Sequence, residues 1–141
     1  MFRIVADEKL TPVIDLFRIE APAIAKKAKA GQFVIVRVDE AGERIPLTLA
    51  DWDAGEGTVT VVAMEVGTST RKLGLLKAGD SIQNLVGPLG LPSDIEKFGT
   101  VICVGGGVHR QIPGRQGPDR RGPGARRGNG TLVRRGAGLL R

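Results

Sequence analysis

The chain has 141 residues and a formal net charge of +6. It contains one cysteine and one histidine, which excludes an internal disulfide and a cluster held by several thiolates, and we expect no metal site. The first ten residues, MFRIVADEKL, lack the apolar block of a signal peptide, and no stretch approaches the ~20 apolar residues of a membrane span, so we expect a cytoplasmic protein without membrane contact.

Short segments rich in β-branched residues recur between turn signals in the first hundred residues, with apolar residues at every second position. This pattern is typical of a small antiparallel barrel, so the fold class we expect is all-β. The segments that we expect to form strands are 2–6, 12–20, 32–38, 44–50, 57–66 and 80–86.

Two connections between these strands carry local signals. Residues 22–29, which begin with proline, suit a brief helical turn that ends at Gly31. Residues 53–57 predict a hairpin connection, because Gly55 and Gly57 permit positive φ.

One regular helix is expected at about 69–77, with Ser69 or Thr70 as its N-cap and its end near Gly79. Residues 100–104, TVICV, then form a continuous apolar run that enters three glycines. Such a run is typical of the first strand of a parallel α/β unit rather than of another barrel strand.

The segment RIPLTLAD, Arg44 to Asp51, is the first that can carry chemistry. At the start of a strand, Arg44 can place its guanidinium on a phosphate while the Thr48 hydroxyl and nearby backbone groups reach a planar ring. The alternative is an edge strand in which Pro46 blocks unwanted pairing.

The segment EVGTST, Glu65 to Thr70, stands directly before the expected helix. Gly67 allows close approach of a ligand to the backbone, and the amides and hydroxyls that follow form an anion seat. The alternative is an ordinary capped helix. Together with the arginine-bearing strand some twenty residues earlier, however, the segment favours a pyrophosphate clamp and therefore a nucleotide cofactor.

The segment VICVGGG, Val101 to Gly107, resembles the strand and glycine turn that open a dinucleotide-binding fold. The full pattern needs further small residues and a helix after the turn. His109, Arg110 and Gln111 follow instead, so the motif is half present.

The composition changes after Val108. Residues 1–108 hold 12 basic and 14 acidic residues, a net charge of −2, whereas residues 109–141 hold nine arginines and one acid, a net charge of +8. This tail also has eight glycines and three prolines. Three interpretations stay open: a basic arm that binds nucleic acid, a disordered end, or a GC-rich gene read out of frame. The tail has no aromatic residue on which a base could stack, which disfavours the first.

Five collinear segments carry a family resemblance: GQFVIVRV (31–38), ERIPLTLAD (43–51), EVGTSTRKLGLLKAGD (65–80), VGPLG (86–90) and VICVGGGV (101–108). Their order and spacing resemble the ferredoxin–NADP reductase superfamily, above all the flavin subunits of NADH-dependent ferredoxin–NADP oxidoreductase, also called sulfide dehydrogenase. The electron-transfer subunit of dihydroorotate dehydrogenase belongs to the same branch. The resemblance covers nearly all of residues 1–108 and none of the tail.

The resemblance implies a Greek-key barrel that binds FAD, followed by a domain that presents NAD(P)H to the flavin. Hydride would pass from nicotinamide to flavin, and single electrons would then pass to an iron–sulfur centre of a partner subunit or ferredoxin. On this basis we expect the FAD-binding barrel at 1–98, the start of a truncated NAD(P)-binding domain at 99–108, and a disordered or out-of-frame tail at 109–141.

The resemblance also implies site residues, and none of them is an acid, base or nucleophile of the reaction. Flavin would lie on one strand, the adenosine or flavin edge on backbone of a second, pyrophosphate at the helix start, and nicotinamide nucleotide at the glycine turn. In this order the residues are Arg44, Pro46, Leu47 and Thr48; Val62, Ala63 and Met64; Gly67, Ser69 and Thr70; and Gly105, Gly106 and Gly107.

Two features depart from the family pattern. In many members the arginine stands three residues before the hydroxyl residue, whereas Arg44 stands four before Thr48. Members of this branch usually bind a [2Fe-2S] cluster through several cysteines near the C-terminus, and this chain has none there.

Overall fold

The computed structural model describes residues 1–97, 99–103 and 132–134. The chain divides into two compact units, Met1–Ser93 and Asp94–Arg141, and each is described by itself. Among the described residues, no helix has the length and apolar character needed to cross a membrane.

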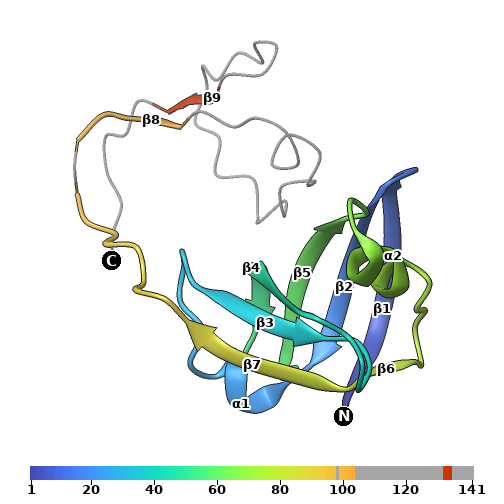
Figure 1. Ribbon diagram of the computed structural model, residues 1–141. Coiled ribbons are helices and arrows are strands. Elements are labelled where there is room, and N and C mark those ends of the chain that lie inside the picture. Colours follow the sequence, from blue (N-terminus) through green and yellow to red (C-terminus); the bar gives the residue numbers. More distant parts are fainter. Residues whose placement is uncertain (98, 104–131, 135–141) are drawn as a thin grey trace. The chain divides into compact units, whose positions relative to one another are not determined.

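The first unit is a seven-stranded antiparallel sheet with two short helices (Figure 1). The strand order is β6-β1-β2-β5-β4-β3-β7. Because β3, β4 and β5 form consecutive hairpins and the earlier β2 lies beside β5, the topology is a Greek key, as expected. The strands are β1 (Phe2–Thr11), β2 (Ile14–Glu20), β3 (Phe33–Arg37), β4 (Arg44–Asp53), β5 (Thr58–Met64), β6 (Ser81–Ile82) and β7 (Asn84–Leu89).

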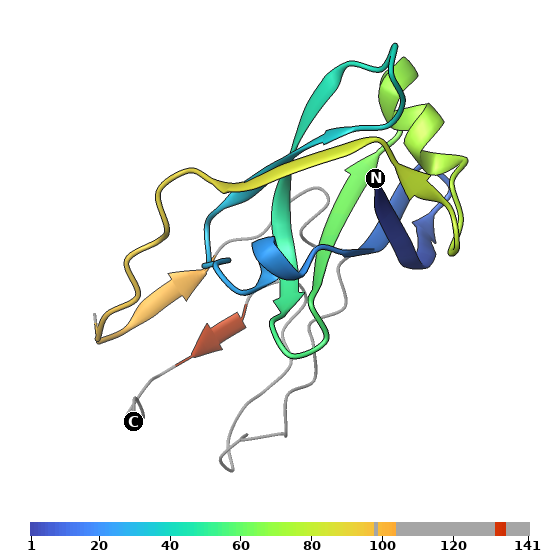
Figure 2. The same ribbon diagram turned by 90° about the horizontal axis from the view of Figure 1, so that it is seen from below.

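The sheet is curled because its two edge strands are joined by one residue. β6 pairs with the start of β1 and β7 pairs with β3, at opposite ends of the strand order, yet only Gln83 separates them in sequence. The Gln83 amide donates a hydrogen bond of 3.0 Å to the carbonyl oxygen of Val38. The sheet must therefore bend until its edges meet at Gln83, and Figure 2 shows this curl from below.

Alternate side chains of the strands fill the interior, where Phe17 is the largest fully buried side chain. Helix α1 (Pro22–Ala25) contributes Ile24 where β5 begins, and helix α2 (Thr68–Gly74) contributes Leu73 where β5 ends (Figure 1). The core thus has a helix at each end. Its other fully buried large side chains are Ile4, Ile19, Val34, Val36, Val59, Val61 and Ile82.

The expected strands are confirmed, and two of the differences in extent have a clear structural reason. β1 continues to Thr11 instead of ending at residue 6, because it pairs with β2 along the whole hairpin. The single strand expected at 80–86 is two strands, β6 and β7, because the chain changes partner at Gln83. Sequence periodicity shows that residues are extended but does not show which strand they pair with.

The expected connections are also present. Asp53 accepts hydrogen bonds from the amides of Gly55 (2.8 Å) and Glu56 (2.9 Å), and Gly57 has φ +70°. The helical turn after Pro22 is α1, which ends at Ala25, earlier than expected, while Gly31 has φ +84°.

The expected helix at 69–77 is α2, at Thr68–Gly74, and its predicted N-cap was wrong. The N-cap is Gly67, and Thr70 lies inside the first turn. The Thr70 hydroxyl accepts hydrogen bonds from the amides of Val66 (3.1 Å) and Gly67 (3.0 Å), so it satisfies donors from a position three residues later than a cap. After the helix ends, Gly79 turns the chain with φ +100°.

The second unit contains two described strands, β8 (Val101–Cys103) and β9 (Leu132–Arg134). The extended conformation expected at 100–104 is confirmed for β8. Its pairing with β9 is antiparallel, whereas the first strand of an α/β unit would pair parallel. β9 also gives residues 132–134 of the predicted disordered tail a strand conformation, and the rest of that tail lies outside the described residues.

We expect Phe17→Ala to lower the free energy of unfolding by about 3–5 kcal/mol, because Phe17 is 1 % exposed and truncation leaves a cavity. Chemical denaturation of the full chain measures this. The control is Val5→Ala, since Val5 is 40 % exposed and its loss should change stability by about 0.5 kcal/mol at most. Similar small losses for both variants would contradict a packed barrel interior.

Candidate functional site

The outer face of the β3–β4 hairpin carries a strip of side chains that changes character along its length. Residues directly opposite each other share a face of the sheet, and the three outward pairs are Phe33–Thr48, Ile35–Pro46 and Arg37–Arg44. The strip is therefore apolar and aromatic at one end and doubly cationic at the other. Of its β4 members, Arg44, Pro46 and Thr48 are exposed.

Leu47 lies on the other face of β4. Its side chain is partly buried and packs against the core, as does that of Ile45. Only the backbone of Leu47 can therefore take part in binding a ligand on the outer face.

Arg37 and Arg44 form a like-charge pair across the hairpin. Such a pair is unfavourable by itself, and neither guanidinium has an ion-pair partner in the described part of the chain. The Nε of Arg37 donates to the carbonyl oxygen of Gly42 at 3.3 Å, which orients its side chain toward the β3–β4 turn. Two cations held side by side form a place for an anion with more than one negative charge. The sequence analysis missed Arg37, and the strand register is the signal that identifies it.

The start of α2 lies beside this cationic end. The Ser69 hydroxyl donates a hydrogen bond of 3.0 Å to the carboxylate of Glu43, the residue before Arg44. The ammonium of Lys72 donates to the Asp39 carboxylate at 2.9 Å, and this contact holds the pKa of Asp39 below its usual value. The structure thus brings together the two segments that the sequence suggested as halves of a phosphate clamp.

The predicted phosphate residues differ in what they can offer. A Cβ added at Gly67 would meet no atom within 4 Å, so the backbone there is open to a ligand. The Thr70 hydroxyl is engaged with backbone, since it also donates to the carbonyl oxygen of Gly67 at 3.1 Å. Ser69 is bonded to Glu43, so a phosphate oxygen would have to replace that carboxylate.

The three residues predicted on β5 differ in exposure. Val62 and Met64 lie on the outer face of β5, where Met64 is 44 % exposed, and Ala63 is buried. The glycines expected at the nicotinamide site, 105–107, lie outside the described residues.

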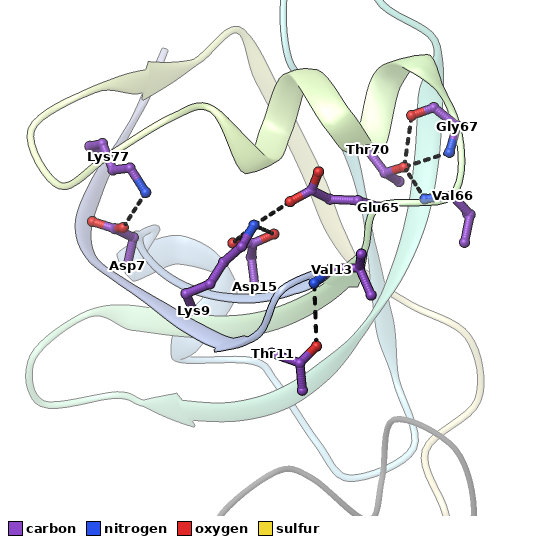
Figure 3. A network of polar contacts seen from close by, with 10 residues as sticks. All are labelled: Asp7, Lys9, Thr11, Val13, Asp15, Glu65, Val66, Gly67, Thr70 and Lys77. Carbon is purple, nitrogen blue, oxygen red and sulfur yellow. Dashed lines mark hydrogen bonds and ion pairs between the residues drawn. The ribbon is translucent and has the colours of Figure 1, made fainter.

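A network of polar contacts between Lys9, Asp15 and Glu65 lies under α2 (Figure 3). The sequence analysis did not identify Lys9 or Asp15. The Lys9 ammonium donates to the carboxylates of Glu65 and of Asp15, the latter at 3.2 Å, and all three side chains are defined here as the Lys9 network. Lys9 and Asp15 lie opposite each other in β1 and β2, and Glu65 follows β5. Glu65 is the first residue of the predicted EVGTST segment.

Burial and Lys9 act in opposite directions on the two carboxyls. The pKa of Asp15 is raised, chiefly because burial penalises its charged form. The pKa of Glu65 is lowered, chiefly by its hydrogen bond from Lys9. Within the described residues, no three His, Cys, Asp or Glu side chains are placed to hold a metal ion.

None of the known protein-family models matches the chain. Among curated proteins, it is 50% identical over 115 residues to an uncharacterized protein in the adh 3′ region of Clostridium beijerinckii, covering 77% of this chain and 39% of that protein. It is 49% identical over 105 residues to a dihydroorotate dehydrogenase B (NAD(+)) electron transfer subunit homolog of Thermotoga maritima, covering 74% and 37%. The chain thus spans about two-fifths of the length of these relatives.

A solved structure shares the fold. It is the structure of NADH-dependent reduced ferredoxin–NADP oxidoreductase, described in connection with flavin-based electron bifurcation. The match has a TM-score of 0.68 and 45% sequence identity, and it covers 70% of this chain and 36% of that chain. The curled Greek-key sheet with its short helix α2 and the similarities to these proteins point to the same fold. The resemblance to the ferredoxin–NADP reductase superfamily is thus confirmed, since the matched relatives include electron transfer subunits of dihydroorotate dehydrogenase B and the structure of NADH-dependent reduced ferredoxin–NADP oxidoreductase shares the fold.

Proposed function

We propose that the first unit binds FAD on the outer face of β3 and β4, as part of a cytoplasmic flavoprotein that passes electrons between NAD(P)H and an iron–sulfur partner. The observation that carries the proposal is the strip from Phe33–Thr48 to Arg37–Arg44, with the start of α2 beside its cationic end. A ligand that fits such a strip has an apolar ring at one end and phosphates at the other.

The length of the strip suits a flavin nucleotide. Thr48 stands four residues after Arg44 in an extended strand, which separates them by about 14 Å. A planar ring near Thr48 and Pro46 would place a ribityl phosphate near Arg44, and the second phosphate would lie toward Gly67 and Ser69. Val62, Ala63 and Met64 would then contact an edge of the cofactor through β5. We keep Gly105, Gly106 and Gly107 as the proposed start of the nicotinamide site.

FAD, when bound, supplies both hydride acceptance and single-electron transfer. The residues of this chain bind and orient it: Arg37 and Arg44 would neutralise phosphate, and the Thr48 hydroxyl and the β4 backbone would hydrogen-bond the ring. Since the chain has a single cysteine, the proposed iron–sulfur centre belongs to a partner subunit or to ferredoxin. The relatives' names, electron transfer subunit and ferredoxin–NADP oxidoreductase, support this assignment.

The decisive experiment is titration of the purified full chain with FAD, followed by the visible absorption band and the fluorescence of the flavin. Binding should perturb both and give a stoichiometric end point. A folded protein that leaves the spectrum of added FAD unchanged would refute the proposal. Anaerobic addition of NADH to the complex then tests electron entry by bleaching of the flavin band.

We expect Arg37→Gln to weaken FAD and FMN binding about tenfold and to leave riboflavin binding unchanged. The reason is the loss of one charge-assisted hydrogen bond to phosphate, a group that riboflavin lacks. Flavin fluorescence titrations measure all three ligands. Arg3→Gln, an exposed arginine of β1, is the control of equal charge. If both variants lost affinity equally, Arg37 would act only through net charge.

We expect Glu43→Gln to strengthen FAD binding about fourfold at low salt, because it removes a carboxylate that competes for Ser69 and repels phosphate at roughly 5 Å. The gain should shrink as salt is added. Titrations at two ionic strengths check this, with Glu56→Gln in the distant β4–β5 hairpin as the control. Weaker FAD binding by Glu43→Gln would contradict a phosphate beside Ser69.

A further inference from the structure

The ammonium group of Lys9 contacts the segment that leads into α2, and that segment also has hydrogen bonds of its own. Lys9 bonds Glu65, the residue that follows β5, and the amide of Glu65 donates to the carbonyl oxygen of Val13 at 2.8 Å. The next amides, of Val66 and Gly67, donate to the Thr70 hydroxyl. The open backbone at Gly67 therefore begins two residues after a side chain whose position depends on Lys9.

Helix α2 packs directly onto the carboxylates that Lys9 binds. A Cβ added at Gly74 would lie 2.7 Å from Oε1 of Glu65 and 3.1 Å from Oδ2 of Asp15. Only a residue without a side chain leaves both carboxylates where they are. The helix is thus located at its start by Thr70 and at its end by contact with the Lys9 network.

Among the described residues, Lys9 is the cation that bonds both carboxylates. Asp15 is buried, with 3 % of its surface exposed, while Arg71 of α2 adds a weaker attraction to Glu65. Hydrogen bonds from Lys9 favour the charged form of both carboxyls, and the pKa of Lys9 is raised in return, chiefly by Glu65 and then by Asp15. Without Lys9, two close like charges would repel each other, and Glu65 is the freer of the two.

We propose that Lys9 is a positioning residue for the phosphate-binding backbone: by holding Glu65 beside Asp15 it fixes residues 65–70 in the conformation that receives the cofactor's pyrophosphate. Lys9 does not touch the ligand and acts through Glu65. The inference rests on the proposed FAD function for its ligand, but the geometry of the loop is testable without FAD.

The test compares Lys9→Met with Lys77→Met. Lys77 forms a similar exposed ion pair, 3.1 Å from Asp7, in the neighbouring loop (Figure 3), so the control removes the same charge and the same kind of contact. At about pH 8, Lys9→Met should bind FAD about tenfold more weakly, the scale of one charge-assisted hydrogen bond to phosphate, while Lys77→Met binds as the parent does.

The pH profile separates positioning from a general loss of stability. In Lys9→Met the two carboxylates lack their cation, so the pKa of one rises and it takes up a proton as the pH falls. The repulsion therefore fades as the pH falls, so the loss of FAD affinity relative to the parent should be smaller at a lower pH than at about pH 8. An equal loss at both pH values, or no loss at either, overturns the inference.

A second variant keeps every charge. Gly74→Ala places a methyl group against the Glu65 carboxylate and should displace it, although alanine is the better helix former. We expect a similar FAD loss that does not depend on pH, because Lys9 is still present. Unchanged FAD binding by Gly74→Ala would overturn the role of Glu65.

Hydrogen exchange of the free protein tests the loop without any ligand. The amides of residues 65–67 should exchange faster in Lys9→Met and Gly74→Ala than in the parent, and at the parent's rate in Lys77→Met. If the parent itself binds no FAD, the proposed function fails while the exchange rates still decide whether Lys9 fixes this backbone. Parental exchange in all three variants overturns the inference.

Discussion

The structure depends on one covalent constraint, the single residue between β6 and β7. Gln83 joins strands that occupy opposite edges of a seven-stranded sheet, so the sheet cannot lie flat. Closure gives the sheet an inner face, on which Phe17 and its neighbours are buried, and an outer face. It also fixes where the ends of β5 lie, and therefore where α1 and α2 close the core.

The candidate site follows from this closure because its parts come from distant segments. The β3–β4 register places Arg37 beside Arg44, and α2 reaches the same end of the hairpin through Ser69–Glu43 and Lys72–Asp39. These two α2 contacts join the helix to the β3–β4 turn at two points, so the turn and the helix start are located relative to each other. A ligand that bridged them would meet a surface that is already organised, which lowers the entropy cost of binding.

Sequence patterns predicted the elements well and the partners of those elements poorly. Periodicity of two located the strands, and Gly31, Gly57 and Gly79 marked turns with positive φ, because these signals are local. The change of partner at Gln83 left no local signal. The sequence predicts Ser69 or Thr70 as the N-cap because a hydroxyl near a helix start most often has that role, whereas the Thr70 hydroxyl accepts its hydrogen bonds from within the first turn. The roles of Arg37 and Lys9 have no local sequence signal for a related reason, since they arise from strand pairing with Arg44 and Asp15 and from the contact of Lys9 with Glu65.

The distribution of charge along the chain indicates that the proposed site would depend on nearby charges rather than on the net charge of the barrel. The net charge of +6 comes from residues 109–141, whereas residues 1–108 carry −2, so the barrel as a whole does not attract an anionic cofactor. Over distances beyond about 8–10 Å the surface charges are largely screened at physiological salt. In the proposed site, attraction for pyrophosphate would therefore come from groups in direct contact with it: two arginines without ion-pair partners among the described residues, and the open backbone at Gly67. Glu43 precedes Arg44 and accepts from Ser69, and Glu65 stands two residues before Gly67, so the affinity of the proposed site would depend on how firmly each of these carboxylates is held by its own donor.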